Sequence, residues 1–125
     1  MASLLSRLYA LMAAAIVAVG CLHMVTTFRL SSATPAGKVW FFGSGIAIAL
    51  AGVLNLLNRR YGLAAPGLRA VCIGTNLMIA GLAGIAGGVT RASFTERVIM
   101  MAILVSTLIL SGVRSASLSP GGTHP

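Results

Sequence analysis

Four long apolar segments, separated by short polar ones, dominate the pattern of this chain. They cover about residues 8–28, 39–57, 68–89 and 94–113. An α-helix rises about 1.5 Å per residue, so a segment of about 20 residues crosses a hydrocarbon layer of about 30 Å. The apolar residues run continuously instead of alternating with polar ones, which favours helices over strands. The pattern therefore predicts an all-α fold, an integral membrane four-helix bundle.

Residues that start or break helices fall at the boundaries of these segments. Pro66 precedes the third segment, and Ser93 and Glu96 have the spacing of a capping box at the start of the fourth. This gives the only acidic residue of the chain a structural role. Residues 115–125 are rich in Ser, Gly and Pro, a composition typical of a disordered tail. We therefore expect a single transmembrane domain over residues 1–114.

Composition and charge also indicate a bilayer as the surrounding medium. The chain is 58% hydrophobic and 8% charged, whereas about 25% of the residues in soluble proteins are charged. The formal net charge is +8, from nine Lys and Arg residues and one acid. The basic residues lie between the apolar segments or at the chain ends, where anionic head groups attract them. We expect the lipid bilayer as a partner and no nucleic acid.

The distribution of basic residues also bears on orientation. With the N-terminus inside, the inner side holds Arg7, Arg59, Arg60, Arg69 and Arg114, and the outer side holds Arg29, Lys38, Arg91 and Arg97. Cytoplasmic loops carry the excess of positive charge in polytopic membrane proteins. The sequence thus favours a bacterial cytoplasmic (inner) membrane protein with both termini inside, by five basic residues to four.

Small residues recur at helical spacing in every segment. In lipid, helices associate through close packing of small residues and through interhelical hydrogen bonds. The aligned residues are Gly20, His23 and Thr27 in the first segment, Gly45, Ala49, Gly52 and Asn55 in the second, Asn76, Ala80, Gly84 and Gly88 in the third, and Thr107, Ser111 and Arg114 in the fourth. Their glycines are the predicted helix-packing positions.

Polar residues within the segments fall into two layers. Asn55 and Asn76 lie at a similar depth, so we predict a contact between them. His23 lies beyond the midplane, level with Ser44, and we expect a neutral imidazole bonded to Ser44 or to a backbone carbonyl. The candidate intramembrane polar site comprises His23, Ser44, Asn55, Thr75, Asn76 and Thr107. Two interpretations stay open: hydrogen bonds that hold the bundle together, or a path for a solute.

The two cysteines do not indicate a metal or redox site. Cys21 and Cys72 lie on different sides of the midplane, too far apart for a disulfide bond, and no Cys-x-x-Cys spacing occurs. Ala18-Val19-Gly20-Cys21 also resembles a bacterial lipobox with Cys21 as the lipidated residue. However, the apolar run continues to Phe28, and a signal core spans only about 7–15 residues. This favours a transmembrane helix.

The inventory of reactive side chains excludes most catalytic sites. A single acid cannot form a pair of carboxylates, and no HExxH or phosphate-binding loop is present. Small multidrug transporters have a similar size, but they need an acidic residue in their first span, and the first apolar segment of this chain contains none. Ser44 and His23 resemble the Ser–His dyad of an intramembrane protease, but Phe42 stands where the rhomboid GxSG pattern requires glycine. We expect no catalytic activity, no cofactor and no metal.

The chain resembles small four-span proteins of bacterial inner membranes, some of which are grouped as DoxX-like. The resemblance rests on Gly20 and His23, on the Trp-Phe-x-Gly-x-Gly stretch over residues 40–45, and on Gly52 and Asn55. It implies a four-span fold and no particular activity.

Together these patterns predict a small polytopic inner-membrane protein without catalytic function. We expect an interaction or accessory subunit that packs with itself, as a homo-oligomer, or with a larger membrane-protein partner. The alternative is an oligomeric carrier or channel for a small solute, with His23, Asn55 and Asn76 lining its path. A carrier needs polar groups around a cavity, whereas a subunit needs small-residue faces on the outside of the bundle.

Overall fold

The computed structural model describes residues 2–30, 33–89 and 93–113, and these form four α-helices. The helices are α1 (Ala2–Thr27), α2 (Pro35–Tyr61), α3 (Pro66–Val89) and α4 (Phe94–Gly112). All four are long and apolar enough to cross a membrane. The all-α fold predicted from the sequence is thus confirmed, and the chain is a multi-pass membrane protein. The tail predicted over residues 115–125 lies outside the described residues.

Helices α1, α2 and α3 begin before the apolar segments predicted for them, and α2 also ends later than its segment. This helix begins at Pro35, because the Thr34 side chain caps it by accepting a hydrogen bond from the Gly37 backbone N–H at 3.1 Å. It continues to Tyr61, and the Gly62 N–H then donates to the Asn58 carbonyl at 2.7 Å. Polar and basic residues can occupy the ends of such helices, because long side chains reach the membrane interface.

The capping box predicted at the start of α4 is confirmed. The Ser93 hydroxyl accepts a hydrogen bond from the Glu96 backbone N–H at 3.3 Å, and Glu96 Oε2 accepts one from the Ser93 N–H at 2.9 Å. Two backbone donors at the helix start are satisfied reciprocally. The sole acidic side chain is therefore used to begin α4.

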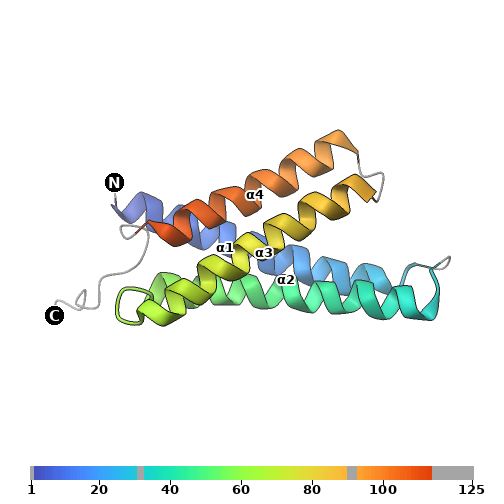
Figure 1. Ribbon diagram of the computed structural model, residues 1–125, viewed down its shortest axis with the longest axis horizontal. Coiled ribbons are helices and arrows are strands. Elements are labelled where there is room, and N and C mark those ends of the chain that lie inside the picture. The colour runs from blue at the N-terminus through green and yellow to red at the C-terminus, as the bar shows by residue number, and fades with distance from the viewer. Residues whose placement is uncertain (1, 31–32, 90–92, 114–125) are drawn as a thin grey trace.

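The four helices form two hairpins, α1–α2 and α3–α4, which cross at an angle (Figure 1). The hairpins meet at the end where the N-terminus and the α2–α3 loop lie, here called the Arg59 end. They diverge toward the opposite end, where α1 ends and α4 begins (Figure 1). At their crossing, Ile16, Ala80 and Leu104 form a small buried cluster. Apolar contact between the hairpins is therefore concentrated in the Arg59 half and the centre.

Glycines bring the backbones of α1 and α2 close together. A Cβ added at Gly20 would lie 2.5 Å from the Ala49 backbone nitrogen, and one at Gly52 would lie 2.7 Å from the Val17 nitrogen. A Cβ at Gly45 would lie 2.9 Å from the Gly20 carbonyl oxygen. The three glycines that the sequence marks for packing on the first two helices all lie in this one contact.

Candidate functional site

Tyr9 is the centre of a buried hydrogen-bond network in the Arg59 half of the bundle. Its side chain is fully buried between the hairpins. The hydroxyl donates to Asn55 Oδ1 at 2.9 Å and accepts from Asn58 Nδ2 at 2.8 Å. A single side chain of α1 thus binds two successive turns of α2.

Asn55 and Asn76 connect α2 to α3 through a reciprocal pair of amide hydrogen bonds. Asn55 Nδ2 donates to Asn76 Oδ1 at 2.8 Å, and Asn76 Nδ2 donates to Asn55 Oδ1 at 2.8 Å. The Cys72 thiol lies beside the pair, 3.3 Å from Asn55 Oδ1 and 3.7 Å from the Tyr9 hydroxyl. The contact that depth alone predicts between these two asparagines is therefore present.

Helix α4 joins the network through its backbone. Asn58 Nδ2, which donates to Tyr9, also lies 3.3 Å from the Ser111 carbonyl oxygen. Ser111 and Thr107 are fully buried, and their hydroxyls donate to carbonyls of their own helix at 2.7 Å and 2.8 Å. Thr75 is half-buried and makes no hydrogen bond to this network in the part of the chain that the structure describes. The network therefore links all four helices at one depth.

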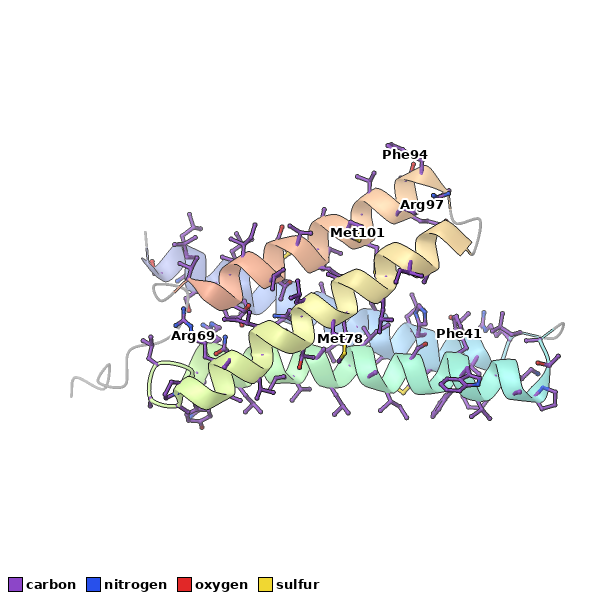
Figure 2. All side chains as sticks on the ribbon, viewed as in Figure 1. Phe41, Arg69, Met78, Phe94, Arg97 and Met101 are labelled. Atoms are coloured by element: carbon purple, nitrogen blue, oxygen red, sulfur yellow. The ribbon has the colours of Figure 1, made fainter. Side chains whose placement is uncertain are left out.

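At the Arg59 end, just outside the network, two arginines each join the two helices of one hairpin. Arg59 Nε donates to the Ser6 carbonyl at 2.8 Å and to the Ser6 hydroxyl at 2.9 Å, which ties α2 to α1. Arg69 donates to the Gly112 carbonyl, which ties the start of α3 to the end of α4 (Figure 2). A cation near a helix C-terminus is also stabilised by the negative end of the helix dipole.

Sequence reasoning missed Tyr9, Asn58 and Cys72 as members of this site. The signal was present in the spacing, because Tyr9 shares a face of α1 with Ala13, Ile16 and Gly20 at intervals of three and four residues. Likewise, Asn58 lies three residues after Asn55, and Cys72 lies four residues before Asn76. Helical spacing from the predicted asparagine pair would have identified both.

His23 lies in the other half of the bundle, and its imidazole hydrogen-bonds the Val19 backbone of its own helix instead of Ser44. Its ring stacks on Phe41 of α2, with ring centroids 4.4 Å apart and planes inclined by 16°. Ser44 instead donates to the Phe41 carbonyl at 2.7 Å, and no hydrogen bond between His23 and Ser44 is found among the described residues. Figure 2 shows Phe41 on the side of α2 that faces the diverging hairpin. The expected contact with α2 is made by ring stacking.

A line of glycines runs along the outside of α3. Gly67, Gly74, Gly81 and Gly88 occur at every seventh residue, and all four are exposed. A Cβ added at any of them would meet nothing within 4 Å. Seven residues are close to two full turns, so these positions share one face. The buried positions of the helix, Cys72, Asn76 and Ala80, lie on the other side. We call this line of four glycines the glycine seam.

The structure also corrects the predicted packing face of α3. Asn76 and Ala80 are buried, but Gly84 and Gly88 are exposed, and a Cβ at either would meet nothing within 4 Å. Each step of four residues advances by about 400°, so the face drifts by about 40° at every step. After three steps the line has rotated by about 120° and points away from the bundle.

Comparison of the chain with models of known protein families, with curated proteins and with solved structures finds no match. Within the described ranges, no group of three or more His, Cys, Asp or Glu side chains is placed to hold a metal ion. The two features that bear on function are therefore the buried polar network and the outward glycine seam.

Proposed function

We propose that this protein is a non-catalytic subunit of a membrane assembly, formed with copies of itself or with a larger membrane protein. Its place is a bacterial cytoplasmic membrane, with both termini inside. The observation that carries the proposal is the glycine seam on the outside of α3, where a Cβ added at any of four glycines at heptad spacing would meet nothing within 4 Å among the described residues.

The physics of helix association in lipid supports this use of the seam. Apolar side chains gain little by leaving lipid for one another, so helices associate where small residues let their backbones approach. Within this chain, Gly20, Gly45 and Gly52 already serve α1 and α2 in that way. The heptad spacing of the seam suits a left-handed crossing of about 20°, as in coiled coils.

The polar network weighs against the carrier alternative. A carrier needs polar groups that surround a cavity near the midplane. Here Tyr9, Asn55 and Asn76 bind one another at 2.8–2.9 Å, so these groups are used to join helices. His23 lies in the other half of the bundle and does not extend the network into a continuous path. The arrangement favours a scaffold.

Substitutions in the seam test the proposal. The protein would be purified from its native membrane in a mild detergent, and native mass spectrometry would count copies and detect partners. We expect the wild type to occur in a complex and Gly81→Leu to occur as a single chain, because the leucine keeps partner backbones apart. Gly43→Leu is the matched control, since Gly43 is also exposed and a Cβ there meets nothing within 4 Å. A single-chain wild type, or a Gly81→Leu complex of unchanged mass, would contradict the proposal.

A further inference from the structure

A shallow apolar groove lies where the end of α1 meets the start of α2, opposite the Arg59 end. It is lined by Thr27, the last residue of α1, by Phe28 directly after it, and by Lys38, Val39, Phe42, Gly43 and Ile46 of α2. Its volume is about 580 Å³, within the range of about 300–1,000 Å³ that small-molecule sites occupy. The groove lies on the α1–α2 hairpin, away from the glycine seam.

The walls of the groove suit a hydrocarbon chain. The rings of Phe28 and Phe42 meet edge to face, with centroids 6.0 Å apart and planes inclined by 71°. The Thr27 hydroxyl donates to the His23 carbonyl at 3.0 Å, so its hydrogen is used within α1. Gly43 keeps the groove open, because it has no side chain and a Cβ there would meet nothing within 4 Å. Along its length the groove thus presents mainly apolar surface.

Lys38 gives the groove a positive charge at the membrane interface. It lies in the first turn of α2, where the helix dipole also favours an anion. The chain has nine basic residues and only one acidic side chain, Glu96. That carboxylate is engaged by the backbone N–H and the hydroxyl of Ser93 at 2.9 Å and 2.8 Å. No other side-chain carboxylate exists in the chain to balance Lys38, so its counter-charge has to come from outside.

We propose that this groove binds one anionic phospholipid. Its phosphate lies beside Lys38, and one acyl chain lies along Phe28, Phe42 and Ile46. Ordinary solvation by anionic lipid would give a similar preference at any exposed basic residue, whereas a lipid bound here gives one that depends on both Lys38 and the open groove. The interface offers lipid phosphate as an abundant anion, and each basic residue near the surface contributes about 1 kcal/mol of attraction to anionic lipid.

Fluorescence of Trp40 provides the test. It is the only tryptophan of the chain, is 80% exposed, and directly follows the groove residues Lys38 and Val39 in α2. The protein would be placed in vesicles of phosphatidylglycerol and phosphatidylcholine at a fixed ratio, with bromine on the acyl chains of one lipid or the other. We expect the binding constant of phosphatidylglycerol to be about fivefold higher than that of phosphatidylcholine, which corresponds to about 1 kcal/mol. Equal quenching by the two lipids would overturn the proposal.

Two pairs of variants locate the site. Lys38→Gln should remove the preference for phosphatidylglycerol, whereas Arg7→Gln, an exposed cation of α1 at the Arg59 end, should retain it. Gly43→Leu should fill the groove and weaken the quenching, whereas Gly84→Leu, an equally open position on α3 outside the glycine seam, should not. A preference that survives Lys38→Gln, or that Gly84→Leu removes, would overturn the proposal. Loss of assembly through the seam would change the mass of the complex and not the lipid preference, so the two proposals fail separately.

Discussion

At the scale of single residues, buried polar side chains hold the hairpins in one register. A hydroxyl or amide in an apolar medium costs free energy unless it is hydrogen-bonded. Tyr9, Asn55 and Asn76 satisfy this requirement through one another, across three helices. A rotation or shift of any one of these helices would leave polar groups without partners. The network therefore selects one arrangement of the hairpins among several that apolar packing alone would allow.

Replacing Tyr9 with phenylalanine tests this role. The variant keeps the ring that packs against Leu110, but it removes the donor to Asn55 and the acceptor of the Asn58 amide. We expect the free energy of unfolding to fall by about 1–2 kcal/mol. The measurement is an SDS titration of the protein in detergent micelles, followed by circular dichroism.

Tyr61 supplies the control for this change, because it is exposed at the end of α2. Tyr61→Phe should alter the free energy of unfolding by less than about 0.5 kcal/mol. If Tyr9→Phe is equally mild, the tyrosine hydroxyl is not a stabilising member of the network.

At the scale of the helices, glycines divide into those that pack inside the chain and those that face outward. At Gly20, Gly45 and Gly52 the backbones of α1 and α2 lie closer together than a methyl group would allow. Gly74 and Gly81 face open space on α3. The same residue type therefore builds the first hairpin and leaves a surface on the second one.

Alanine substitutions distinguish the two kinds of glycine. In Gly52→Ala the new Cβ would lie 2.7 Å from the Val17 nitrogen and 2.8 Å from the Ala13 carbonyl oxygen. Backbone atoms cannot rotate aside, so the helices must separate, at a cost of about 1–3 kcal/mol. The same detergent titration should show this loss, whereas Gly43→Ala should be neutral or slightly stabilising, because alanine is the better helix former. Equal stability of the two variants would contradict the close α1–α2 contact.

At the scale of the whole molecule, the hairpins meet at the Arg59 end and diverge at the other (Figure 1). At the Arg59 end, one arginine joins the two helices of each hairpin. Arg59 and Arg69 therefore have two roles in this description. They bind Ser6 and Gly112 within the fold, and in the proposed orientation they would add to the positive charge on the cytoplasmic side. In that orientation the same side chains would serve both the architecture and the topology.

The balance of charge makes orientation testable by mutation. A cytoplasmic reporter fused after residue 125 should be active, and a periplasmic one should be inactive. Replacing Arg59, Arg60 and Arg69 with glutamine leaves the outer side with more basic residues, so the signal should shift toward the periplasmic reporter. Replacing Lys38 with glutamine should strengthen the original signal. A periplasmic signal from the unmodified chain would reverse the assignment.

The sequence by itself determined the number and kind of elements, because continuous apolar runs and the Ser93–Glu96 capping box act locally. It also determined that Asn55 and Asn76 meet, since depth in a membrane follows from position along a helix. Only the tertiary structure decided how each helix is rotated about its axis. It placed Tyr9 at the centre of the network, stacked His23 on Phe41 and turned Gly84 outward. The physical reason is that lipid and bundle interior are both apolar, so hydrophobicity alone does not distinguish the face that packs from the face that meets lipid.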